Sequence, residues 1–493
     1  MRKSRPQLSD VVMAKSEALL QQRSGSSSVA SESSDLSATS VSSSSSKSSS
    51  VSSSLWWIHD KGYDLDEFVQ RHPGGVEAIL LGKGRDCTAL VESYHPFTNQ
   101  HWKVLEKYLV EQPEEDNIDE QISTKDRNDL QQQKDFFYEV LKKRVSTVLI
   151  SKGIDPKDDR GATITRTLYY CVVFASWIYT GYLHLSGRIL GSFLFAITGW
   201  LMGALGHDAG HFSASRIPWI NEWGVWGMSF ICNPILWQHQ HTYGHHSFTN
   251  EFGHDPDLHH FDTFLRVHKR IQRQSHYRYQ SNGLYVMFAY LFVVFGTCFY
   301  IPWGVLRTNS LYGIIEWSDK DRRTKSTGMQ LHFFLYIFIV AVVPMYTHPS
   351  LLSAICASYL HVGTLGLVFA LFSQINHLNE LSLESDMISR NEKENSKQHS
   401  TSRRDPRLAQ SWAAAQVETS NNFASQSLFW HVLSNGLNHQ IEHHLFPGLN
   451  HCHLHHIAPV VKATCLEFGV QYKSYDTWKD LMCATLEWFD KLS

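Results

Sequence analysis

Histidines are the residues of this chain whose spacing most clearly predicts chemistry. The 493-residue sequence holds 29 of them, and they gather in clusters. One cluster is HDAGH, with His207 and His211, and a second is HTYGHH, with His241, His245 and His246. Two histidines four positions apart on a helix lie on one face, a turn apart, so each cluster can present paired imidazoles to one metal centre. A single pair of this kind also occurs by chance. It predicts a metal site only when further histidine clusters accompany it in the same chain.

A third cluster, QIEHH, contributes Gln440, His443 and His444. The three clusters together hold more imidazoles than one zinc ion would use, since zinc takes about four ligands. Imidazole ligands without thiolates suit iron, copper, nickel or zinc. Two iron ions that activate dioxygen fit best with a membrane protein and an apolar substrate. A zinc hydrolase is disfavoured, because the first cluster lacks the glutamate of the HExxH motif.

Another pair of histidines predicts a haem site nearer the N-terminus. His72 opens an HPGG motif, and His95 lies in the sequence SYHPF. Two imidazoles from separate helical hairpins can bind haem iron from opposite faces, which leaves no position for oxygen and suits electron transfer. The glycines permit a tight turn that brings the backbone close to the macrocycle.

Apolar stretches close to bilayer length must position the three clusters. Residues 167–186 and 188–206 predict one helical hairpin, and residues 331–347 and 351–372 predict a second. One metal centre needs all clusters on one side of the membrane, so an even number of crossings must separate the second cluster from the third. The apolar stretch 284–304 is therefore expected to be interfacial or buried against the bundle. Loops rich in Lys and Arg lie on the side of the clusters, which the positive-inside rule makes cytosolic.

The expected fold class is an α-helical integral membrane protein with four transmembrane helices, interfacial helices and a cytosolic di-iron cap, preceded by a small α+β domain. The serine-rich stretch near the N-terminus has too little apolar surface to offset the entropy of ordering. The predicted segments are a disordered tail (1–54), a small haem-binding domain (55–112), a linker with a cytosolic helix (113–160), the membrane domain (161–475) and a C-terminal tail (476–493).

Composition disfavours several other classes of protein. The formal net charge is only -3, so nucleic acid is not expected as a partner. The 8 cysteines are scattered without a CxxC pair, which argues against a disulfide scaffold or a thiolate metal site and fits a reducing cytosol. The N-terminus is not a clear signal peptide, because its apolar stretches are short and interrupted. No GxGxxG motif follows a predicted strand, so electrons must come from another protein.

The three clusters, with SFTN and DPD after the second, resemble those of the membrane fatty acid desaturases. The resemblance covers roughly residues 55–475, and Gln440 in place of a histidine is similar to the front-end subgroup. It implies that Gln440 is a ligand or a hydrogen-bond partner of a ligand. It also implies a further imidazole from the end of the last membrane helix, for which His377 is the candidate. The iron ligands implied from the clusters are His207, His211, His241, His245, His246, His443 and His444.

Residues 55–112 resemble cytochrome b5. Trp57, Tyr63 and Phe68 precede the HPGG motif as in that family, and the resemblance implies haem b with His72 and His95 as its axial ligands. Members of that family usually have another strand and helix before the tryptophan, where this chain has polyserine. We therefore expect the domain either to start late or to borrow residues 9–22.

Together the two resemblances imply an O2-dependent oxidoreductase that introduces a cis double bond into a long-chain acyl group, carried on a lipid or on CoA. The fused haem would pass electrons to the two irons, and an NADH-cytochrome b5 reductase would reload it. A front-end position (Δ5- or Δ6-like) on a polyunsaturated chain is expected, with another position on a saturated chain left open. The expected membrane is the endoplasmic reticulum, with the plastid as the alternative.

Other functions stay open at this stage. The same scaffold could desaturate a sphingoid base or hydroxylate a lipid. A protein of another class, a membrane-anchored cytochrome b5-type electron carrier, would bind haem but no other iron. The clusters do not predict bond position, acyl length or oligomeric state.

Overall fold

The fold is described from a computed structural model, for residues 55–111, 135–317, 319–383 and 411–493. The predicted disordered tail (1–54) lies outside the described residues, as does much of the predicted linker. The described residues all fall within one structural unit, Ser50–Ser493.

The N-terminal module is a small α+β domain, as expected. Its antiparallel sheet has the order β1-β2-β3, with Trp56 opposite Tyr63. Trp56, Ile58 and Tyr63 are buried in its own apolar core. Its elements are β1 (Trp56–Ile58), β2 (Lys61–Tyr63), η1 (Val69–Arg71), α3 (Val76–Leu80), α4 (Thr88–Tyr94), α5 (Gln100–Leu105) and β3 (Leu109–Glu111).

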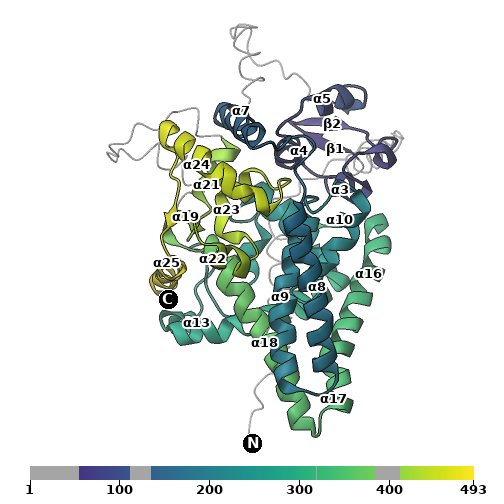
Figure 1. The fold of residues 1–493 in the computed structure, drawn as a ribbon, viewed down its shortest axis with the longest axis vertical. Helices are drawn as coiled ribbons and strands as arrows, with labels where there is room; N and C mark the ends of the chain where they lie inside the picture. The colour runs from purple at the N-terminus through teal and green to yellow at the C-terminus, as the bar shows by residue number, and fades with distance from the viewer. Residues whose placement is uncertain (1–54, 112–134, 318, 384–410) are drawn as a thin grey trace, which may run out of the picture. The chain divides into compact units, whose positions relative to one another are not determined.

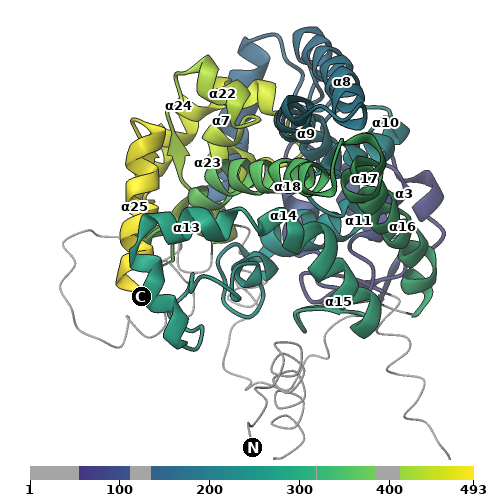
Figure 2. The same cartoon turned by 90° about the horizontal axis from the view of Figure 1, so that it is seen from below.

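The two predicted hairpins form the long helices of the membrane domain. The first consists of α8 (Ile164–Leu185) and α9 (Ile189–Gly210). In the second, α16 (Asp319–Ile337), η7 (Phe338–Val342) and α17 (Val343–Thr347) run on without a break, and α18 (Leu351–Ser373) returns. Helix α9 packs against both α8 and α18 (Figures 1 and 2).

Within the described residues, four helices are long and apolar enough to cross a membrane, which agrees with the expected number. Their membership differs from the expectation, because Gly283–Thr308 qualifies and α8 does not. Helix α8 is as long as α9, at 22 residues, but it carries polar residues such as Arg166 and His184. The four helices are Ile189–Gly210, Gly283–Thr308, Lys325–Thr347 and Leu351–Asn376.

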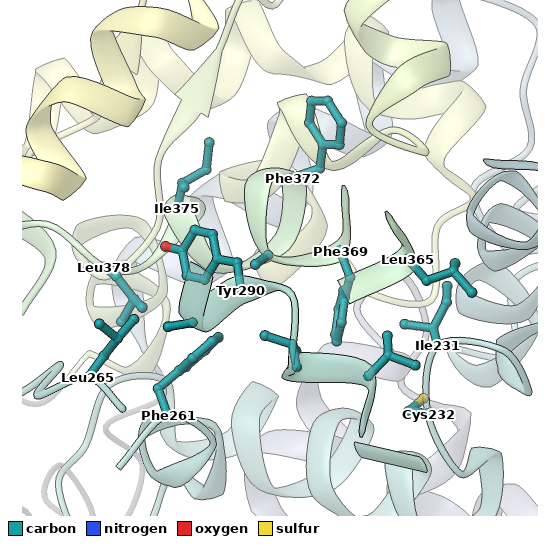
Figure 3. Packing of buried hydrophobic residues seen from close by; sticks show 14 of the residues in the cluster. Ile231, Cys232, Phe261, Leu265, Tyr290, Leu365, Phe369, Phe372, Ile375 and Leu378 are labelled. Carbon is teal, nitrogen blue, oxygen red and sulfur yellow. The ribbon is translucent and has the colours of Figure 1, made fainter. Parts of the chain in front are cut away.

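The stretch expected at 284–304 is a broken helix that packs on the bundle. Its α13 and α14 contact α18, and Tyr290 and Val294 are buried in the main apolar core, part of which is drawn in Figure 3. These contacts match the expected burial against the bundle, but the length and composition of the stretch also make it a candidate membrane span, which the sequence analysis did not expect. Its parts are α13 (Gly283–Tyr290), α14 (Val293–Phe295), η6 (Gly296–Tyr300) and α15 (Ile301–Thr308).

The remaining elements are further helices and two-residue strands, and η3, α12 and α23 among them carry the second and third histidine clusters. They comprise α7 (Phe136–Ser151), α10 (Pro218–Gly224), η2 (Val225–Met228), α11 (Pro234–Trp237), η3 (Gln238–His245), α12 (His246–Phe248), η4 (Pro256–His259), η5 (Ser275–Ser281), β4 (Ser310–Leu311), β5 (Ile315–Glu316), η8 (Gln374–Asn376), α19 (Glu380–Leu383), α21 (Trp412–Glu418), β6 (Asn422–Phe423), α22 (Leu428–Leu433), η10 (Leu437–His439), α23 (Gln440–Leu445), α24 (His451–Phe468), β7 (Ser474–Tyr475) and α25 (Trp478–Lys491).

The segment expected as a C-terminal tail, 476–493, instead forms a packed helix. Helix α25 begins with a capping box between Thr477 and Asp480. It buries Leu481, Trp488 and Phe489 in the main apolar core. The spacing of these apolar residues gives one buried face, which explains why the segment folds.

Candidate metal centre and haem site

Local structure at three helix ends brings the histidine clusters together. His207 lies in the last turn of α9, and His211 caps its C-terminus. The second cluster lies in η3, which is a π-helix, and continues into α12. The third cluster forms α23, and His377 directly follows η8 at the end of α18.

The imidazoles form two groups, which we name the first and second groups. The first group is His207, His211, His241 and His443. The second is His245, His377 and His444. Within each group, one nitrogen from every residue lies within 4.8 Å of the others, which suits the ligands of a single ion. All of these side chains are buried.

His246 lies between the two groups. Its ring centroid is 4.5 Å from that of His211 in the first group and 4.2 Å from that of His444 in the second. Two neighbouring metal positions with one imidazole between them therefore account for every histidine of the three clusters.

In the second group each ring has its Nδ1 held by an oxygen atom. Nδ1 of His245 lies 3.0 Å from Oδ2 of Asp255, and Nδ1 of His377 lies 3.1 Å from the carbonyl oxygen of Thr419. Nδ1 of His444 lies 2.8 Å from Oε1 of Gln416. An oxygen at Nδ1 fixes the tautomer and leaves Nε2 available for a metal.

The first group has fewer such partners. Nδ1 of His211 lies 2.6 Å from Oη of Tyr94, and Nδ1 of His241 lies 3.6 Å from Asp257. In the described part of the chain, neither ring nitrogen of His207 or of His443 has a hydrogen-bond partner. Buried polar atoms without partners are rare, and a bound ion would satisfy them.

Gln440 reaches the second group through its side-chain amide. Its Nε2 lies 2.9 Å from Nε2 of His377 and 3.1 Å from Nε2 of His444. The two ends of an amide are assigned from their surroundings, and a metal on these imidazoles would favour the oxygen at this point. The amide of Gln440 thus lies within hydrogen-bond distance of two imidazoles of the second group, and its expected role as a ligand or as a partner of the ligands stays a prediction.

His451 lies beside the first group, although it is not among the ligands expected from the sequence. Its ring centroid is 4.6 Å from that of His443 and 5.0 Å from that of His207. Nδ1 bonds to the buried carboxylate of Asp208, while Nε2 has no partner among the described residues. Asp208 is in turn held by Arg166 at 2.9 Å. The only sequence signal for this residue is its place seven positions after the third cluster.

Burial sets the protonation of most of these imidazoles. It lowers the pKa of His211, His246, His443 and His444 well below the usual value, so they are neutral, as metal ligands must be. Burial would also lower the pKa of His245, but the carboxylates of Asp255 and Asp257 outweigh it and raise that pKa to about 9.

A cavity leads from the imidazoles into the apolar core. His241, His245, His377 and Gln440 line one part of it. Apolar side chains line another part, among them Ile231, Cys232, Phe369 and Leu378, which Figure 3 shows within the core cluster.

The predicted haem ligands face each other in the N-terminal module. The ring centroids of His72 and His95 are 6.3 Å apart, which leaves room for an ion with a bond of about 2 Å to each. Nδ1 of His72 lies 3.0 Å from the carbonyl oxygen of Gly75, and Nδ1 of His95 lies 2.9 Å from that of Val91. Burial lowers the pKa of both, that of His95 to about 3, so both are neutral and suit haem iron.

Two buried imidazole groups at an apolar cavity, beside membrane-length helices and a domain suited to haem, define a membrane-bound redox enzyme. Comparison with known families agrees. The fatty acid desaturase family matches residues 184–476, and the cytochrome b5-like heme/steroid binding domain matches residues 41–112. The first match covers more than half of the chain, and the chain belongs to the fatty acid desaturase family. It is therefore an oxidoreductase with a fused cytochrome b5-like domain.

Curated relatives are similar over most of their length. "Acyl-lipid (8-3)-desaturase B" of Dictyostelium discoideum is 27% identical over 89% of this chain and 91% of its own. "Acyl-lipid omega-13 desaturase" of Chlamydomonas reinhardtii is 26% identical over 84% and 88%. "Acyl-lipid (8-3)-desaturase" of Physcomitrium patens is 29% identical over 85% and 84%. No solved structure matches the chain significantly.

Proposed function

We propose that the chain introduces a cis double bond into a long-chain acyl group of a membrane lipid or of acyl-CoA, using dioxygen and electrons from its own haem domain. The observation that carries this proposal is the pair of imidazole groups at one part of a cavity whose other part is apolar. Membership of the fatty acid desaturase family supports it.

The two groups are proposed to hold two iron ions. His207, His211, His241 and His443 would hold one, and the second group would hold the other, with His246 and Gln440 beside them. When bound, the irons supply the oxidant that an unactivated C–H bond requires. Buried imidazoles without thiolates suit this metal.

The protein itself positions the substrate and excludes water. An acyl chain along Ile231, Phe369 and Leu378 would bury its methylenes, each worth about 0.8 kcal/mol. The same apolar walls keep water away from the reacting carbon atoms. The depth of this cavity would set which bond is placed next to His241 and His245.

The proposed position is front-end, between an existing double bond and the carboxyl end. Gln440 in the third cluster and the two relatives with printed (8-3) activity support it. The omega-13 relative shows that similar chains differ in position. The proposed electron source for the haem is an NADH-cytochrome b5 reductase, and the proposed membrane is the endoplasmic reticulum with the metal groups facing the cytosol.

The test is the fatty acid profile of yeast that expresses the chain and is fed saturated and polyunsaturated acids in turn. The negative control is His443→Ala, and the matched control is His455→Ala, at an exposed histidine of α24. We expect a new unsaturated acid with the parent and with His455→Ala, but none with His443→Ala. Mass spectrometry of the derivatised acid then locates the double bond.

Absence of a new acid in every feeding, with iron and haem both bound to the purified protein, would overturn the acyl desaturase proposal. Sphingoid bases and hydroxylated lipids in the same extracts would then show which alternative holds. Haem without any other iron would instead favour an electron carrier.

A further inference from the structure

A residue of the N-terminal module contacts a residue of the first imidazole group. Tyr94 is the last residue of α4 and directly precedes the haem-ligand candidate His95. Its Oη lies 2.6 Å from Nδ1 of His211. The two rings are nearly parallel, at 11°, with centroids 6.4 Å apart.

The hydrogen bond has a defined direction once a metal is bound. Nε2 of His211 has no partner in the described ranges and belongs to the first group. With a metal on Nε2, the neutral ring carries its proton on Nδ1, which donates to the phenol oxygen of Tyr94. Tyr94 is then the acceptor that orients a metal ligand.

Tyr94 is itself held in place. Arg160 donates to its carbonyl oxygen over 2.8 Å, and Phe212 meets its ring edge-on with centroids 6.0 Å apart. A Cβ on Gly448 would lie 3.2 Å from the Tyr94 ring, so the opposite backbone approaches closely. Burial raises the pKa of the phenol well above its usual value, which keeps it neutral.

Further contacts seat the module around this point. Nη1 of Arg85 lies 2.9 Å from Nδ1 of His239, and the hydroxyl of Tyr243 donates to the carbonyl oxygen of Asp86 over 3.0 Å. Phe97 stacks on Phe446, with centroids 5.6 Å apart. The Tyr94–His211 contact is therefore one of several contacts between the N-terminal module and the rest of the described chain, and we name this set of contacts the docked surface.

We propose that Tyr94 is the electronic link between the haem domain and the metal centre, joined to His95 by one peptide bond and to His211 by one hydrogen bond. This inference rests on the proposed haem and iron sites. Electronic coupling falls steeply with distance and is stronger through bonds and hydrogen bonds than through gaps.

The proposed electron transfer needs neither oxidation nor deprotonation of Tyr94. With haem held by His72 and His95 and iron held by the first group, the haem would supply one electron at a time: it would go from ferrous to ferric as one ferric ion of the metal centre goes to ferrous. The phenol keeps its own proton, because its oxygen only accepts the hydrogen bond that Nδ1–H of His211 donates. Two such transfers supply the two electrons that a desaturation needs, and an external reductase restores the haem.

Three variants of the full-length protein in detergent separate this role from others. Tyr94→Phe keeps the ring and the stacking but removes the acceptor oxygen. Tyr94→Gln restores an acceptor without the ring. Tyr243→Phe is the matched control, because it removes a hydrogen bond of the same docked surface that does not touch a proposed ligand.

The measurement is the rate at which haem loses an injected electron under argon. A light flash with a ruthenium photoreductant delivers one electron to the haem, and the ferrous haem absorption is followed. We expect the decay to slow at least about tenfold in Tyr94→Phe, partly to recover in Tyr94→Gln and to be unchanged in Tyr243→Phe. The rate should not change on dilution, since donor and acceptor lie in one chain. The mixed-valent iron signal in electron paramagnetic resonance should appear with the same rate.

Equal rates in Tyr94→Phe and the parent would overturn the inference. So would an equal loss in Tyr94→Phe and Tyr243→Phe, which would assign the effect to docking. Tyr94→Phe could instead lose iron while the molecules that still hold iron transfer electrons at the rate of the parent. That result would overturn the inference and leave Tyr94 only the role of orienting His211. None of these rates depends on lipid product, so a protein that transfers electrons but forms no alkene would count against the proposed function alone.

Discussion

At the scale of single residues, the atom that holds one nitrogen of a histidine decides which nitrogen faces the metal position. Asp255 holds His245 and Gln416 holds His444 in this way. The sequence analysis predicted the imidazoles from their spacing, but Gln416 lies 28 positions from His444. Partners that distant are brought close only by the tertiary fold, so spacing within a cluster could not indicate them.

His451 provides a test at this scale. Its ring lies against His443, and its Nδ1 is fixed by Asp208, so Nε2 is free to bind a metal in the first position. We expect His451→Gln to weaken iron binding there by about 10- to 100-fold. Iron per protein, measured by plasma mass spectrometry after dialysis against a graded chelator series, checks this.

The matched control is His455→Gln, on the same helix α24 but exposed. It should keep the iron content of the parent. Equal retention of iron by both variants would show that His451 is only a buried neighbour of the ligands.

At the scale of elements, the predicted hairpins depend on close helix contacts that a sequence pattern does not report. Apolar runs indicated that α9 and α18 exist, and the structure has them within a few residues of the predicted bounds. The π-helix η3 was not predicted, because a π-turn has no apolar repeat of its own. His241 and His245 both face the candidate metal centre, as expected from their spacing, and they contribute to the first and to the second group respectively.

Gly366 tests the packing of α18 on the broken helix. A Cβ there would lie 2.6 Å from the backbone oxygen of Tyr290, so one of the two helices must shift. We expect Gly366→Ala to lower stability by about 1–3 kcal/mol, as overpacked positions do. Thermal unfolding in detergent, followed by intrinsic fluorescence, measures the difference.

Gly363→Ala is the control, one turn earlier on α18. Its Cβ would make an ordinary contact of 3.5 Å with Cδ2 of Leu291, and alanine favours a helix by about 0.5–1 kcal/mol over glycine. It should therefore leave the melting temperature equal or higher. A similar fall of the melting temperature in both variants would contradict the prediction, because the close contact with the backbone of Tyr290 would then not explain the loss of stability.

Lys473, next to β7, gives a prediction for pH. Burial lowers its pKa to about 7, although the charge of Glu418 opposes the shift. In the unfolded chain the group stays protonated to its ordinary pKa of 10.5. Between pH 7 and pH 10.5 the unfolded state binds more protons than the folded state, so rising pH stabilises the fold. Below pH 7 the lysine is protonated in both states, so the cost of burying its charge does not change with pH.

We therefore expect the melting temperature of the parent to rise between pH 7 and pH 9 relative to that of Lys473→Met, which has nothing to titrate at this position. Lys479→Met, at a lysine with an exposed side chain on α25, controls for the loss of one surface charge. Parallel curves for the parent and Lys473→Met across this range would contradict the prediction.

At the scale of the whole molecule, the haem-ligand candidates lie in a module with its own apolar core, and the imidazole groups lie outside that module. The sequence predicted a haem site and a metal site from short motifs, HPGG for one and the histidine clusters for the other, and the ligands of both stay predictions. It did not predict their contact through Tyr94, which joins residues 117 positions apart. Nor did it predict that α25 closes the core, since a short amphipathic segment at a chain end resembles a tail until its packing partner is known.

The separate apolar core of the N-terminal module leads to a prediction about loss of each cofactor. The haem-ligand candidates His72 and His95 have their Nδ1 partners within the N-terminal module, and the imidazole groups contain no residue of that module. His72→Ala should therefore lose the haem absorption while keeping the iron content of the parent. His443→Ala should lose iron while keeping the haem spectrum. Both should form no unsaturated product in yeast, whereas His455→Ala should behave as the parent in all three measurements. If His72→Ala also lost its iron, the two sites would fold as one cooperative unit, and the rates measured for Tyr94 variants would have to be compared only among molecules that hold both cofactors.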